Sequence, residues 1–132
     1  MNSVDFLKFY VSVEEVFIEF IPDKYIEHQP INETEFVKKI IHFRKIIKDI
    51  NDYCRINRKQ QVVILDCDKC VNVLRINLVL FAKAVRDLAR VHKNADMLAE
   101  VQVIHSNKYI KALYNGLKPL IPSEISELVV LY

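Results

Sequence analysis

The chain has 132 residues, of which 52% are apolar and 27% are charged, and its formal net charge is +2. These values exclude a disordered chain and predict one domain that buries about two thirds of its unfolded surface. The near-neutral charge argues against nucleic acid as a partner. With Gly116 as its single glycine, the chain also lacks the glycine-rich loops that bind nucleotide phosphates.

The cysteine count and the apolar runs indicate a cellular compartment. Three cysteines are an odd number and too few for a disulfide scaffold, which favours a reducing environment. No apolar run reaches the ~18 residues of a membrane span, and the chain does not start with a basic segment followed by an apolar one. We therefore expect a cytoplasmic protein without a transmembrane segment.

The N-terminal part of the chain switches from an extended to a helical pattern. Residues 6–21 are rich in aromatic and β-branched side chains that alternate with polar ones, which predicts a strand or a hairpin kinked near Glu14-Glu15. Asn32 followed by Glu35 resembles a capping box. Apolar residues then recur at helical spacing, so we expect a long amphipathic helix over about 33–57.

The middle of the chain predicts a buried strand and an unusually apolar helix. Residues 62–66 (VVILD) form a short run that is apolar on both faces and ends in a carboxylate, which is typical of a central strand in a largely parallel sheet. Residues 72–93 predict a helix that is apolar nearly all round. Such a helix must be covered on more than one side, and part of that cover is expected from another subunit.

The C-terminal part completes an alternating pattern. Residues 101–104 predict a third strand, a helix follows over about 107–115 with Asn115-Gly116 as its stop, and 128–131 form a last strand. The order β-α-β-α-β-α-β predicts an α/β fold in a single domain over 1–132. We expect three layers, with helices on both faces of a mostly parallel sheet of four to five strands.

These last elements carry a resemblance to a known family. Residues 101–122 read VQVIHSNKYIKALYNGLKPLIP and are followed by the strand at 128–131. Together with 62–66 and the long helix after it, this succession of strand, Asn-containing turn, amphipathic helix and Lys-Pro step resembles the CRAL-TRIO lipid-binding family over about 60–131. The STAS regulatory domains have a similar alternation, but no glycine lies near Asp66 to form their Asp-Ser-x-Gly turn.

The resemblance implies recognition of a lipid or of a protein partner, without bond-making and without a cofactor. The family has a separate N-terminal helical domain and further structure around its lipid cavity, and we expect neither in this sequence. We therefore expect the hydrophobic pocket to be incomplete.

Polar residues follow the second and third predicted strands, and the carboxyl ends of parallel strands border the ligand crevice in open sheets. A histidine between two carboxylates could serve as a general base or a metal ligand. The competing interpretation makes these residues helix caps, with Asp68 capping a helix near Val71 and Ser106 or Asn107 capping the next. We predict a crevice without a metal. Its residues are Asp66, Asp68, His105, Ser106 and Asn107.

Cys67 and Cys70 support an alternative, catalytic interpretation. A CxxC motif between a strand and a helix favours thiolates, and Lys69 would add to the effect, so the motif could belong to a thiol-disulfide redox protein. However, no aromatic residue precedes Cys67, and two small buried residues flanking a turn would give the same pattern. A zinc site is not expected, because only Cys54 and distant histidines remain to complete four ligands.

The aromatic side chains of residues 6–25 bear on self-association. Most of them should belong to the core, but an exposed first strand would offer an edge for pairing between subunits. Together with the apolar second helix, this edge predicts a homodimer. No residue set supplies a nucleophile, a base and an oxyanion donor in recognisable spacing. We therefore interpret the chain as a non-catalytic intracellular binding module for a protein partner or a lipid.

Overall fold

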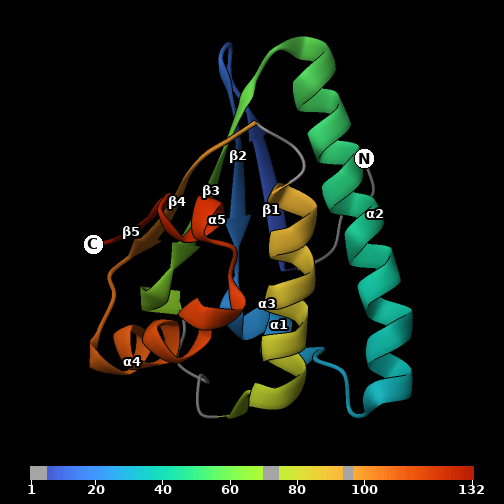
Figure 1. Ribbon diagram of the computed structural model, residues 1–132, viewed down its shortest axis with the longest axis vertical. Coiled ribbons are helices and arrows are strands. Elements are labelled where there is room, and N and C mark those ends of the chain that lie inside the picture. The colour runs from blue at the N-terminus through green and yellow to red at the C-terminus, as the bar shows by residue number, and fades with distance from the viewer. Residues whose placement is uncertain (1–5, 70–74, 94–96) are drawn as a thin grey trace.

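The computed structural model describes residues 6–69, 75–93 and 97–132. Its centre is a five-stranded sheet in the order β1-β2-β3-β4-β5 (Figure 1). The strands are β1 (Leu7–Val11), β2 (Glu15–Phe20), β3 (Gln60–Asp66), β4 (Leu98–Ile104) and β5 (Val129–Leu131). β1 and β2 form the expected hairpin, and β2 to β5 pair in parallel. The α/β class and the mostly parallel sheet are thus confirmed, and β3 is its central strand, as predicted.

The helices of the described residues lie in the connections between the parallel strands. They are α1 (Pro22–Glu27), α2 (Glu33–Asn57), α3 (Leu78–Lys93), α4 (Lys108–Leu117) and α5 (Ser123–Ser126), with 3₁₀ turns η1 (Cys67–Lys69) and η3 (Lys118–Leu120). α2 has the predicted bounds, and the Asn32 side chain accepts a hydrogen bond from the Glu35 N–H at 2.9 Å. The capping signal of the sequence is therefore confirmed. No helix of the described residues is long and apolar enough to cross a membrane.

The described helices cover one face of the sheet. Ile18 of β2 packs in the main core cluster with residues of α2 and α3, and Val103 of β4 packs against Ile110 of α4. Ile18 and Val103 are on the same face, because Ile18 pairs with Val63 and Val103 pairs with the residue two positions further along β3. We expected helices on both faces of the sheet, but the helices of the described residues cover one face. Each parallel strand is added in the same direction, so right-handed crossovers place successive helices on the same side.

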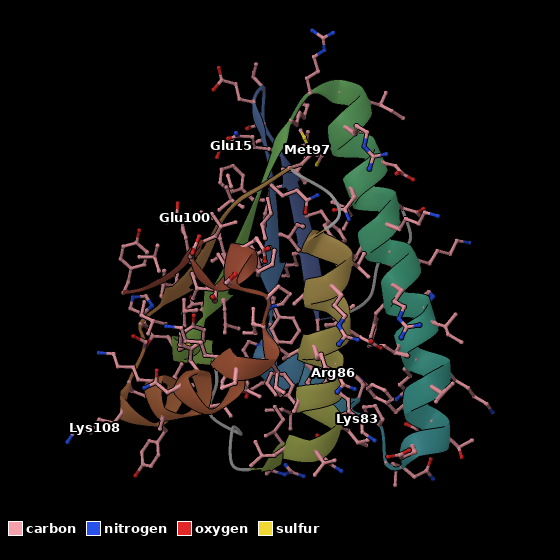
Figure 2. The ribbon with its side chains drawn as sticks, in the orientation of Figure 1. Glu15, Lys83, Arg86, Met97, Glu100 and Lys108 are labelled. Atoms are coloured by element: carbon pink, nitrogen blue, oxygen red, sulfur yellow. The ribbon has the colours of Figure 1, made fainter. Side chains whose placement is uncertain are left out.

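Two sets of contacts fix α1, α2 and α3 against each other. Phe6 packs edge-to-face on Phe43 of α2 and Tyr25 of α1, with ring centroids 4.8 and 5.6 Å apart. Such pairs contribute about 0.5–1.5 kcal/mol beyond their buried area. The ion pairs Arg44–Asp87 and Lys83–Glu33 then join α2 to α3, and Figure 2 shows Lys83 on the side of α3 near α2.

Two expected helix ends are wrong. The helix predicted from residue 72 begins at Leu78, because the Asn77 side chain accepts a hydrogen bond from the Leu80 N–H at 3.2 Å and so caps α3. Residues 70–74 lie outside the described residues. The helix expected to stop at Asn115-Gly116 continues to Leu117, and Gly116 does not have a positive φ. Gly116 therefore does not form the left-handed stop that the sequence indicated.

Candidate ligand-binding site

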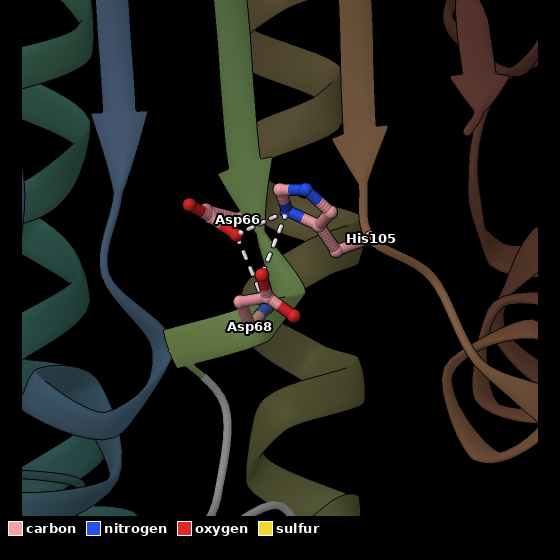
Figure 3. Close-up of side chains that lie close together, drawn as sticks. All are labelled: Asp66, Asp68 and His105. Carbon is pink, nitrogen blue, oxygen red and sulfur yellow. Dashed lines mark hydrogen bonds and ion pairs between the residues drawn. The ribbon is translucent and has the colours of Figure 1, made fainter.

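Three of the five predicted crevice residues meet at the carboxyl edge of the sheet. His105 Nδ1 lies 3.1 Å from Asp66 Oδ1 and 3.3 Å from Asp68 Oδ2 (Figure 3). Asp66 ends β3, and its register partner Ile104 ends β4, so the residues at these strand ends are neighbours. His105 has a left-handed φ of 54°, which turns the chain sharply where β4 ends.

The electrostatics of this cluster favour a charged histidine. The hydrogen bond to Asp66, followed by the charge of Asp68, raises the pKa of His105 above its ordinary value. The three side chains have ligand atoms within 4.8 Å of one another, which is a spacing that a divalent cation could share. The ion pairs themselves account for the arrangement, because His105 and Asp68 are largely exposed and their charges remain solvated.

The other two predicted crevice residues bind backbone groups. Asn107 Oδ1 accepts a hydrogen bond from the Ile110 N–H at 3.0 Å, so the capping interpretation is confirmed for Asn107. Ser106 Oγ donates to the Tyr132 carbonyl oxygen at 2.7 Å and ties the C-terminal strand to the turn after β4. Asp68, the other candidate cap, contacts His105 instead, and the helix start that it was expected to cap near Val71 lies outside the described residues.

Cys67 lies in the helix-covered core. Its side chain is buried in a cluster with Val103 and Ile110. It belongs to the short turn η1, and the next α-helix of the described residues begins at Leu78. Burial in apolar surroundings disfavours a thiolate. Cys70 lies outside the described residues, so the redox interpretation stays a prediction.

An apolar cavity of about 270 Å³ lies between the sheet and its helices. The sheet lines one wall through residues such as Val63, Val101 and Val129. The opposite wall comes from four helices and from residues beside α3 and η3. Its residues are Pro22, Tyr25, Ile26, Ile76, Phe81, Val85, Ala89, Ile110, Leu113, Tyr114, Leu117, Ile121 and Ile125.

A second cavity of about 250 Å³ adjoins the first on the side of α2. Phe43 and Ile47 of α2 and Ala84 of α3 line it. The two cavities share seven lining residues, which are Phe20, Tyr25, Val63, Leu65, Phe81, Val85 and Val101. They therefore form adjoining parts of one apolar space between the sheet and its helices.

Neither a protein-family model nor a curated protein matches the sequence. Among solved structures, the chain is similar to the crystal structure of Sfh5, with a TM-score of 0.57 and 10% sequence identity. Sfh5 is a Sec14-family (CRAL-TRIO) protein. The superposition covers 88% of this chain and 42% of Sfh5, so the chain spans less than half of that structure. The similarity extends to the fold alone, and at that level it agrees with the resemblance found in the sequence.

The sequence interpretation expected an incomplete hydrophobic pocket from the family resemblance, but it did not identify the residues that line the cavities. Part of the apolar surface of the helix expected over residues 72–93 was assigned to a contact with another subunit. In the structure, Phe81, Val85 and Ala89 of α3 face the cavities, whereas Leu78 and Val79 are exposed. The excess of apolar surface on α3 therefore has an explanation within the chain. A subunit contact through the remaining exposed residues stays a prediction.

Proposed function

We propose that the chain is a non-catalytic binding module that takes the apolar part of a lipid into the space between the sheet and α3. The observation that carries this proposal is the pair of adjoining cavities, which share seven apolar or aromatic lining residues. Each cavity is close to the lower end of the 300–1,000 Å³ range of ligand sites. The similarity to the fold of a Sec14-family protein supports the same function.

The physical basis is the transfer of apolar surface out of water. Each Å² of ligand surface that the cavities cover contributes about 25 cal/mol to binding. A cavity of about 150 Å³ in another protein holds benzene, so the larger volumes here accept a bicyclic ring or a short acyl segment.

Binding of the uncharged fluorophore N-phenyl-1-naphthylamine tests this proposal. Saturable binding with one or two sites is expected, and Ala84→Leu or Ala89→Leu should weaken it at least tenfold, because each substitution fills one of the cavities. Ala112→Leu adds the same atoms at an exposed position of α4 and should leave binding unchanged. Circular dichroism shows whether each variant is folded. Equal binding by folded wild-type and cavity-filled proteins would overturn the proposal.

We also propose that the chain self-associates and that it does so in the cytoplasm. One edge of the sheet favours the self-association. β1 is an edge strand, and Tyr10 and Val11 on it are about half exposed. Unpaired edge strands bind further strands, either of a second copy or of a protein partner. Light scattering at high protein concentration should show a dimer. A monomer under these conditions would remove the edge contact without affecting the lipid site.

A further inference from the structure

Tyr25 occupies a special position at the junction of the two cavities. It lies in α1, it lines both cavities, and its side chain is 5% exposed. Its ring packs against Phe6, Phe20 and Phe81, with ring centroids 5.6 to 5.8 Å apart. The ring is therefore held on several sides, which fixes the place of its hydroxyl group.

The Tyr25 hydroxyl makes no hydrogen bond to any residue that the structure describes. Buried tyrosine hydroxyls usually have a partner. Among the described residues, the side-chain oxygen or nitrogen that is fully enclosed and has no partner is Gln61 Oε1. The Tyr25 oxygen also has no partner, so it is not fully enclosed and keeps some accessible surface. The other cavity tyrosine differs, because the Tyr114 hydroxyl donates to the Ser126 carbonyl oxygen at 3.5 Å.

The rest of the lining restricts what can lie beside this hydroxyl. Among the described residues, the side chains that line the two cavities include none with a charge. A phosphate or carboxylate placed there would lose its hydration without gaining a cationic partner, and this costs several kcal/mol or more. An uncharged oxygen needs one donor, and Tyr25 offers one.

We propose that Tyr25 selects an uncharged amphiphile by donating a hydrogen bond to its hydroxyl or carbonyl oxygen. This inference rests on the proposed lipid-binding function and defines the polarity of the ligand. Burial raises the pKa of Tyr25 to about 12, so its phenol stays protonated and remains a donor at neutral pH. The apolar part of the ligand then occupies the cavities on either side of the Tyr25 ring.

Three naphthalene derivatives test the selection, because they differ by a single polar group. Calorimetric titration should show that 2-naphthol binds more tightly than naphthalene, and that 2-naphthyl phosphate binds at least tenfold more weakly than 2-naphthol. In Tyr25→Phe, 2-naphthol should lose about fivefold to tenfold in affinity, which is the usual net contribution of one neutral hydrogen bond. Naphthalene should bind Tyr25→Phe as it binds the wild type.

Two control variants complete the experiment. Tyr109→Phe removes an exposed hydroxyl on α4, and Tyr114→Phe removes the cavity hydroxyl that already has a partner. Both should keep the preference for 2-naphthol. Equal losses for 2-naphthol and naphthalene in Tyr25→Phe, or a loss confined to Tyr114→Phe, would overturn the inference while leaving lipid binding intact. If naphthalene itself does not bind, the proposed function fails as well.

Discussion

Asp66 and His105 join the ends of two parallel strands through a contact of 3.1 Å between Oδ1 and Nδ1. Asp66 is the last residue of β3, and His105 directly follows β4. Asp66 Oδ1 also accepts a hydrogen bond from the Asp68 N–H at 3.0 Å, so one carboxylate orders both the turn after β3 and the side chain after β4. The contact therefore holds the carboxyl edge of the sheet together.

This contact makes the stability of the fold depend on pH. The hydrogen bond to Asp66 and the charge of Asp68 raise the pKa of His105 above 6.5. A group whose folded-state pKa is raised stabilises the fold fully below pH 6.5, and that stabilisation is lost as the pH rises through the raised pKa. An NMR titration of the imidazole should show the raised pKa, and Asp66→Asn should lower it more than Asp68→Asn. A native pKa at or below that of the urea-unfolded chain would contradict this prediction.

The Asn107 cap predicts a stability difference between two substitutions. Asn107→Ala removes the oxygen that accepts from the Ile110 N–H, so the free energy of unfolding should fall by about 1 kcal/mol. Asn107→Ser keeps a capping oxygen and should cost much less. Urea unfolding measures both values. Equal losses for the two variants would show that the side-chain cap does not stabilise α4.

Gly116 should be a site of easy stabilisation. It lies inside α4 without a positive φ, and a Cβ atom added there would meet nothing within 4 Å. Gly116→Ala should therefore raise the free energy of unfolding by about 0.5–1 kcal/mol, because alanine loses less backbone entropy in a helix. The same urea experiment measures the change. A destabilised variant would indicate that the chain turns left-handed at this position, as the sequence first suggested.

The buried cysteines predict slow thiol chemistry. Cys54 and Cys67 are 0% and 5% exposed, and burial raises the pKa of the Cys54 thiol. Native protein should therefore react with a thiol reagent far more slowly at these two positions than urea-unfolded protein does. Mass spectrometry after mild oxidation addresses the rival function. A readily formed bridge between Cys67 and Cys70 would favour the redox interpretation over lipid binding.

Local signals in the sequence predicted much of the fold. The period of the apolar residues and the Asn32 cap were enough to predict α2, because both act within a few residues of the helix itself. The apolar run at residues 62–66 was enough to place β3 at the centre of the sheet. The capping role of Asn107 was also among the stated alternatives, since its spacing from Ile110 is local.

What the sequence could not predict depends on contacts between distant segments. The one-sided layering follows from the order in which strands join the sheet, and no local pattern records that order. The cavities depend on how far α3 and α4 lie from the sheet, so their apolar lining looked like ordinary core. Tyr25 does lie in the core, as expected, but its place beside both cavities was not predicted. It belongs to α1, a six-residue helix, and the sequence indicated only a break at Pro22-Asp23 there.

Methyl NMR during a titration with naphthalene tests the central claim most directly. The lipid-binding account predicts saturable shifts for methyl groups that line the shared space, above all those of Val63, Leu65 and Val101. The exposed methyl groups of Val37 and Ile41 on α2 should not move. Unchanged cavity signals at saturating naphthalene, or shifts confined to the outer surface of α2, would contradict the account.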